Sequence, residues 1–191
     1  MPPKIKITKE DIINTALNLL RENGDSTVNA RGIAKALNCS TQPVFSNFAS
    51  MDELYGALTE AAYNLYLGFL KNETESEKYP KYKSLGMAYV RFAKEESELF
   101  KFLFMRDRKS EGLVPTTDFD ASVEMIMKAN NIPRERAEIM HLEMWTCVHG
   151  IGTILATSFL ELDFELISNM LTDVYQGIRT RHLSEENNGC N

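Results

Sequence analysis

Cysteine, tryptophan and long hydrophobic runs are all scarce in this chain of 191 residues. The three cysteines, Cys39, Cys147 and Cys190, are far apart and odd in number, which argues against a disulfide framework and, without a Cys-x-x-Cys pair, against a zinc ribbon. The opening MPPKIKITKED lacks the apolar core of a signal peptide, and the most apolar later run, 148–160, is too short to span a bilayer. We therefore expect a cytoplasmic protein that makes no membrane contact.

Positive charge is also in short supply, because 21 Lys and Arg residues face 27 Asp and Glu residues, which gives a formal net charge of -6. The overall field repels phosphate and so argues against indiscriminate binding to nucleic acid or anionic membrane. Any contact with nucleic acid must then be local. The hydrophobic content of 43% is enough to bury the core of one large domain or two modest ones.

Signatures of catalysis and of metal binding are missing as well. The sequence has no Gly-rich phosphate loop and no nucleophile elbow, and the single Glu138-x-x-His141 pair is not repeated as a di-iron bundle requires. We expect no enzymatic activity, no cofactor and no metal. The alternative left open is an all-α enzyme, or a small-molecule or lipid-binding protein, that does not bind DNA.

Helical periodicity is present along the whole chain, with no convincing period-two strand, so we predict an all-α fold. Its parts are a domain of three short helices over 1–49, a connecting helix over 50–72 and a C-terminal helical domain over 73–191. Local signals mark the helix starts and a turn: a Thr8 cap with Asp11, caps at Asn29 and Ser40, a Ser50 capping box with Glu53, and a left-handed Asn38.

The third short helix, over 41–48, has two unlike sides. A rotation of about 100° per residue puts Val44 and Phe48 on an inner side. The outer side carries no charge and, apart from one proline, is polar; its residues are Gln42, Pro43, Ser46 and Asn47. Gln and Asn side chains can bond two atoms of a base edge at once, so this geometry is typical of a helix-turn-helix reader of the major groove. A purely structural three-helix bundle is the alternative.

The stretch from Ile7 to Leu58 resembles the N-terminal DNA-binding domain of the tetracycline-repressor (TetR) family in its helix order, caps and turn. The resemblance implies a dimeric, usually bacterial transcription factor whose C-terminal helices bind a small molecule. The residues it implies near bases are Arg31, Thr41, Gln42, Pro43 and Asn47, those near phosphates are Asn29, Phe45 and Ser46, and a basic arm would hold Lys4, Lys6 and Lys9.

Three positions depart from that family's usual choices, and each departure removes a phosphate donor or a charge. Phe45 stands where Tyr is common, Asn47 where His is common and Met51 where Lys is common. Basic and acidic residues also cancel through residue 58. We therefore predict weak non-specific binding with a shallow salt dependence.

The C-terminal half carries weaker signals of the same family. The segment EMWTCVHGIGTIL, 143–155, is similar to the Trp-x-x-x-His-Gly segment of one subclass, and 91–104 resembles a helix-to-helix junction of that half. Flexible Met and aromatic side chains in this half could line a cavity for an apolar or amphipathic effector. The alternative is that they are ordinary core residues. These candidates are Phe100, Phe104, Met105, Phe119, Met125, Met140, His141, Met144 and Trp145.

The last two long helices, over 134–160 and 164–183, are the predicted dimer contact. We expect Gly150 and Gly152 to permit close backbone approach, with apolar area from Ile151, Leu155, Phe159, Ile167, Leu171 and Val174. The alternative is that these helices pack entirely within one chain. The predicted function is a ligand-released homodimeric repressor that binds a pseudo-palindromic operator on double-stranded DNA.

Overall fold

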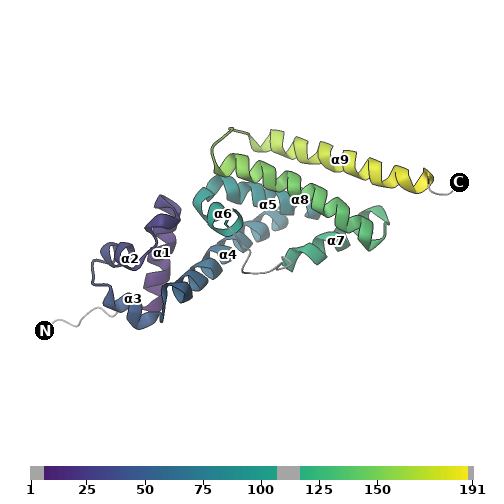
Figure 1. Cartoon of the computed structure of the whole chain (residues 1–191). Helices are drawn as coiled ribbons and strands as arrows, with labels where there is room; N and C mark the ends of the chain where they lie inside the picture. Colours follow the sequence, from purple (N-terminus) through teal and green to yellow (C-terminus); the bar gives the residue numbers. More distant parts are fainter. Residues whose placement is uncertain (1–6, 107–116, 189–191) are drawn as a thin grey trace. The chain divides into compact units, whose positions relative to one another are not determined.

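The structure, a computed structural model, describes residues 7–106 and 117–188, and within these ranges every regular element is helical (Figure 1). The predicted all-α class is therefore confirmed. The elements are α1 (Lys9–Asn23), a 3₁₀ turn (Asp25–Thr27), α2 (Ala30–Ala36), α3 (Gln42–Asn47), α4 (Met51–Glu75), α5 (Lys81–Glu95), α6 (Ser97–Phe104), α7 (Thr117–Asn130), α8 (Arg134–Ala156) and α9 (Phe164–Asn188).

The helices form two compact units that do not follow the chain as single segments. Of the described residues, unit 1 contains 7–68 and 96–106, and unit 2 contains 69–95 and 117–188. Helix α6 thus belongs to unit 1 although it comes after α5, and α4 begins in unit 1 and ends in unit 2. No helix in the described part of the chain is long and apolar enough to cross a membrane.

Helix α1 begins at a complete capping box, as the sequence predicts. The Asp11 N–H donates to the Thr8 hydroxyl oxygen over 3.1 Å, and the Thr8 N–H donates to the Asp11 carboxylate over 2.9 Å. Two of the N–H groups that a helix start leaves unpaired are satisfied in this way. The bonds also lower the pKa of the Asp11 carboxyl, because they favour its charged form.

The next two helices are joined by the predicted turn. Asn29 caps α2 by accepting the Gly32 N–H over 2.9 Å, and Asn38 adopts a left-handed φ of 52°. The prediction of Ser40 as the cap of the third helix is wrong. Thr41 precedes the first helical residue of α3 and makes no side-chain cap bond, while its carbonyl accepts the first backbone bond from the Val44 N–H over 3.1 Å.

The core of unit 1 comes from the inner faces of its helices. Fully or almost fully buried side chains are Ile12, Ala16 and Leu20 of α1, Ile33 of α2, Val44 of α3, Phe48 after α3, Leu54 and Leu58 of α4, and Leu99 and Phe100 of α6. Tyr55 of α4 donates its hydroxyl to the Val28 carbonyl over 2.9 Å, and burial raises its pKa to about 12. Glu96, just before α6, accepts a bidentate pair of hydrogen bonds from Arg21 of α1.

The start of α4 also follows the sequence, with one difference. The Glu53 N–H donates to the Ser50 hydroxyl oxygen over 3.2 Å, which is half of the predicted capping box. The Glu53 carboxylate accepts from the Ala49 N–H over 2.7 Å rather than from Ser50. The reciprocal bond has therefore moved one residue earlier in the chain.

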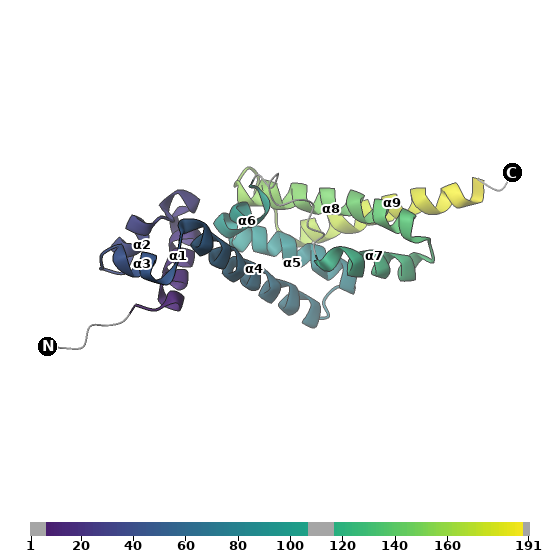
Figure 2. The ribbon, with the colours of Figure 1, turned by 60° about the horizontal axis from the view of Figure 1, so that its bottom comes forward.

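Unit 2 is a layer of long helices in which α5 and α7 pack against α8, and α8 packs against α9 (Figures 1 and 2). One core cluster joins α7 to α8 through Val123, Ile126, Ala137 and Met140. At Gly86 of α5, an added Cβ would lie 3.3 Å from Val148 of α8, so this glycine allows the two helices to approach closely.

Candidate nucleic-acid interface

Helix α3 presents one side to the core of unit 1 and the opposite side to solvent. Val44 and Phe48 are each 1% exposed, whereas Gln42, Phe45 and Ser46 are exposed. The two inner side chains fix the rotation of the helix about its own axis, because turning it would expose both of them to water. The outward orientation of Gln42 therefore follows from the burial of Val44 and Phe48, as predicted.

Internal hydrogen bonds occupy several of the predicted contact groups. The Ser46 hydroxyl donates to the Gln42 carbonyl over 2.9 Å. The half-buried Asn47 donates its amide hydrogens to the Pro43 carbonyl over 2.8 Å and to the Ile7 carbonyl over 3.4 Å. Both partners are acceptors, which fixes the amide with its nitrogen toward them. Gln42, in contrast, makes no side-chain hydrogen bond within the described residues.

The remaining predicted contact residues of α2 and α3 differ in whether their side chains are exposed and free to bind DNA. Arg31 is exposed and forms no ion pair with any described residue. Asn29 uses its oxygen to cap α2, and its amide group lies 3.4 Å from both the Ser26 and Thr27 carbonyls. Thr41 and Pro43 are half-buried. Among the predicted contacts, Arg31 and Gln42 are thus the exposed polar side chains that make no hydrogen bond or ion pair with described residues.

Apart from Arg31, which pairs with no described residue, the predicted basic residues within the described ranges add little positive charge to this surface. The Lys9 ammonium is 2.8 Å from the Glu53 carboxylate and 4.6 Å from the centre of the Phe48 ring. This pairing lowers the pKa of Glu53, whose carboxylate also accepts the Ala49 N–H. The other members of the predicted basic arm, Lys4 and Lys6, lie outside the described residues.

The candidate effector-binding residues divide between the two units. In unit 1, Phe100 is fully buried, Phe104 is half-buried and Met105 is 41% exposed. The rings of Phe100 and Phe104 lie 5.3 Å apart, and Phe104 makes an edge contact with Tyr66 at the same distance. These phenylalanines are therefore part of an aromatic cluster of unit 1.

The other candidates are in unit 2, in different environments. Met140 belongs to the core cluster and Met144 is buried, while Met125 and Phe119 are half-buried. Trp145 is 45% exposed, and its ring stacks on that of His149 at 5.0 Å between centroids and 9° between planes.

Two tyrosine-histidine pairs connect α5 to α8, and sequence analysis missed the tyrosines. Tyr82 lies 2.9 Å from Nδ1 of His141, and Tyr89 lies 2.8 Å from Nδ1 of His149. The available signal was the spacing: Tyr82 and Tyr89 are seven residues apart on α5, and His141 and His149 are eight apart on α8. Each spacing is about two helical turns. Burial lowers the pKa of both histidines and so favours their neutral rings, and the tautomer of each ring sets whether Nδ1 accepts from or donates to the tyrosine hydroxyl.

Acidic side chains near these histidines have other partners. Glu143 binds His182, with 3.0 Å between Oε2 and Nε2, and Glu138 pairs with Arg134 over 2.7 Å. Within the described ranges, no three His, Cys, Asp or Glu side chains converge as a metal site would.

Of the six apolar residues predicted to supply dimer area, Phe159 is exposed and Val174 half-buried, and the other four are buried. Ile151, Leu155, Ile167 and Leu171 are all buried inside their own chain, so the prediction that they supply dimer area is wrong. A single sequence does not show which side of a long helix its own subunit covers. The exposed large apolar side chains of this region are Ile139, Leu142, Trp145, Phe159, Leu160 and Leu166.

Comparison with known proteins shows which fold the chain has. No family sequence model and no characterised protein sequence matches the chain. Among solved structures, it is similar to a TetR-like transcriptional regulator from Rhodococcus sp. RHA1, with a TM-score of 0.60, 12% identity and coverage of 96% of this chain and 98% of that one. The chain has the TetR fold. The structural similarity covers nearly the whole chain, whereas the resemblance seen in the sequence covers Ile7 to Leu58. At 12% identity the similarity shows the fold but does not assign a role to any single residue.

Proposed function

We propose that the protein is a non-enzymatic, DNA-binding transcriptional regulator that reads the major groove with the outer side of α3. The observation that carries this proposal is the burial of Val44 and Phe48 beneath an exposed Gln42. A short helix held in this way at the surface of a small bundle is the arrangement by which helix-turn-helix proteins present side chains to base edges. The TetR fold supports the same conclusion.

The available side chains suit base recognition better than phosphate binding. The Gln42 amide has both its donor and its acceptor free of described partners, as bidentate bonding to adenine N6 and N7 requires. Arg31, exposed on α2, can donate two hydrogen bonds to guanine or to a phosphate. Thr41 and Pro43 complete the surface by van der Waals contact, and Asn29 and Ser46 lie beside it.

The protein acts as a homodimer in this proposal, with α8 and α9 of each copy forming a four-helix contact. Ile139, Leu142 and Trp145 on α8 and Leu166 on α9 offer exposed apolar area. Gly150 and Gly177 have open space where a Cβ would be, so no described residue of their own chain requires glycine there. A closely approaching second backbone would supply the reason, and two-fold symmetry would then require a pseudo-palindromic operator with half-sites about one helical turn apart.

The regulator is proposed to be a repressor that an apolar or amphipathic effector releases. An effector shifts the equilibrium between DNA-binding and non-binding states only by its difference in affinity for the two. Helix α4, shared by both units, gives the two a continuous connection. A ligand that binds the protein should then weaken operator binding, and an unchanged operator affinity would reject this switch.

Selection of bound duplexes from a random DNA pool tests the central proposal. The wild-type chain should enrich one pseudo-palindromic sequence, and Gln42→Ala should relax the preference at one base pair in each half-site, by about 1–3 kcal/mol. Asn64→Ala, at an exposed position of α4, is the matched control and should keep the wild-type preference. Failure of the wild type to enrich any duplex would reject DNA binding and favour a small-molecule or lipid-binding protein. Enrichment that is identical for Gln42→Ala would reject only the assigned face.

A further inference from the structure

The outer side of α3 is unusually poor in groups that bind phosphate. Its sequence, QPVFSN, contains no charged residue. The proton of the Ser46 hydroxyl is donated to the Gln42 carbonyl, and both amide hydrogens of Asn47 are directed at carbonyls of Pro43 and Ile7. A phosphate oxygen needs a donor or a positive charge. The side chains of α3 are therefore better suited to bind the edge of a base than to bind a phosphate of the DNA backbone.

Phe45 is the exception to the polar character of this surface. Its side chain is 55% exposed, the largest value for a large apolar side chain among the described residues of unit 1. It is three residues from Gln42, so the two are neighbours on one helix surface. A single exposed apolar residue on a protein surface is ordinary. Phe45 differs because it lies on the helix that we assign to the major groove, while Val44 and Phe48 already fill the core beneath.

We propose that Phe45 reads the C5-methyl group of a thymine, next to the base that Gln42 reads. This inference rests on the proposed function, because it places α3 in the major groove. The thymine methyl is the apolar group that the major-groove edges of the four base pairs present, and a phenyl ring is suited to contact it. Phe45 has no hydroxyl to donate to a phosphate. Each half-site is thus specified by an A·T pair at the position facing Phe45, with adenine expected at the neighbouring position facing Gln42.

Replacement of thymine by deoxyuridine removes the methyl group and leaves base pairing unchanged, so it isolates this contact. Each thymine of one selected half-site is replaced in turn, and the Kd of the full-length protein is measured. One replacement should weaken wild-type binding about fourfold, the effect of one buried methyl group, and the others should leave it unchanged. Phe45→Leu, which keeps an apolar side chain, should retain the sensitivity at that position.

Phe45→Ala provides the decisive comparison. It should bind the thymine and deoxyuridine duplexes equally at the sensitive position, because the ring that contacts the methyl group is gone. Thermal unfolding should show the variant as stable as the wild type, since the ring is largely exposed.

Several outcomes overturn the inference. Wild-type binding that is insensitive to every replacement would do so while leaving the proposed function intact, because the operator itself would still be bound. A Phe45→Ala variant that keeps the wild-type sensitivity would assign the effect to DNA shape or to another residue. If the wild type selected no duplex at all, the proposed function would fail first and this inference with it.

Discussion

Gly24 ends α1 in a backbone conformation that favours glycine, and it lies close to Glu98 of α6. Its φ of 78° and ψ of 175° lie in a region that is essentially restricted to glycine. A Cβ at this position would also lie 2.8 Å from Oε2 of Glu98. The Glu98 carboxylate is the end of a flexible side chain and can move, so backbone strain is the larger cost.

Gly24→Ala should therefore lower the free energy of unfolding by about 1–3 kcal/mol, measured by urea denaturation. Gly56→Ala is the matched control, because Gly56 lies within α4 with open space where the methyl group would be. That variant should be stabilised by about 0.5–1 kcal/mol. Equal effects of the two substitutions would show that the left-handed conformation of Gly24 does not matter.

Between elements, the two tyrosine-histidine pairs couple the packing of α5 and α8 to pH. Burial lowers the pKa of His141 and of His149 below the ordinary 6.5. The unfolded chain therefore takes up protons at a pH where the folded histidines are still neutral. The resulting contribution to stability is fully present well above the ordinary pKa of 6.5 and is lost as the pH falls through that value toward the folded pKa values.

The free energy of unfolding should fall between about pH 7.5 and pH 5.5, and this fall should be smaller in a His141→Gln, His149→Gln double variant. The slope with pH is the measurement, because the substitutions also change packing. Carboxyl groups with lowered pKa, such as Asp11 and Glu53, titrate below 4.5 and do not affect this window. An identical slope in the wild type and the double variant would contradict the role of these histidines.

At the scale of the whole molecule, charge sets how the proposed DNA binding should depend on salt. The chain has a net charge of -6, and Lys9, beside α3, is paired with Glu53. Few counterions are then released when DNA binds, so the dependence of affinity on salt should be shallow.

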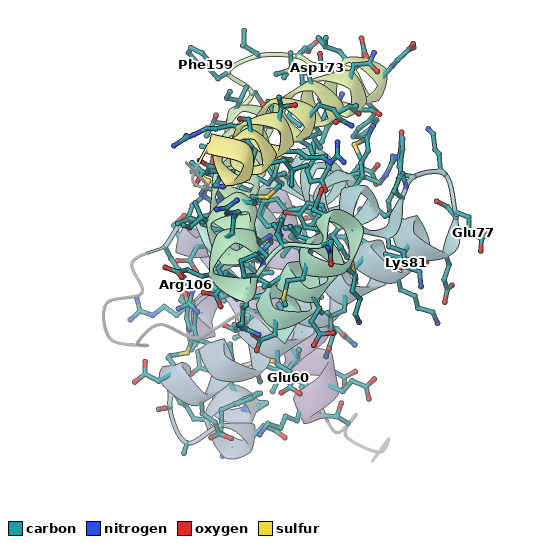
Figure 3. All side chains as sticks on the ribbon, turned by 90° about the vertical axis from the view of Figure 1, so that its right-hand side faces the viewer. Glu60, Glu77, Lys81, Arg106, Phe159 and Asp173 are labelled. Atoms are coloured by element: carbon teal, nitrogen blue, oxygen red, sulfur yellow. The ribbon has the colours of Figure 1, made fainter. Side chains whose placement is uncertain are left out.

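Glu53→Gln should free Lys9 to face DNA and steepen the log-log salt slope by about 0.9 per subunit. The control is Glu60→Gln, which removes the same charge from an exposed position of the same helix (Figure 3). Duplex binding measured at several salt concentrations gives both slopes. If the two variants shift the slope equally, net charge rather than the Lys9 pair is responsible.

The association of two whole chains should depend on the exposed side of α8. Leu142 is 57% exposed, so Leu142→Asp should leave the subunit folded and shift a micromolar sample from dimer to monomer in analytical ultracentrifugation. Leu67→Asp, at a 38% exposed position of α4, should remain dimeric. Phe159, 77% exposed, lies in the connection between α8 and α9 (Figure 3). A monomeric wild type would remove the reason for a palindromic operator.

Sequence alone predicted the helix starts at Thr8, Asn29 and Ser50, the turn at Asn38 and the inner pair Val44 and Phe48. These features are local, since a cap needs only a side-chain oxygen and an N–H two or three residues away. Apart from the cap of the third helix, which is Thr41 and not Ser40, the failures concern relations between distant segments. The assignment of Ile151 and Leu171 to a dimer surface was wrong, because either side of a long apolar helix can face its own subunit.

The sequence by itself therefore determined the all-α class, the order of the helices and the outward side of α3, because each depends on spacing within a few turns. Only the tertiary structure decided that α6 belongs to the same unit as the first helices. It also decided that Asn47 donates its amide hydrogens to the carbonyls of Pro43 and Ile7, and that Tyr82 and Tyr89 form hydrogen bonds with histidines of α8. Apart from the Asn47–Pro43 bond within α3, these contacts join residues 40 to 75 positions apart, where chain periodicity carries no information about distance.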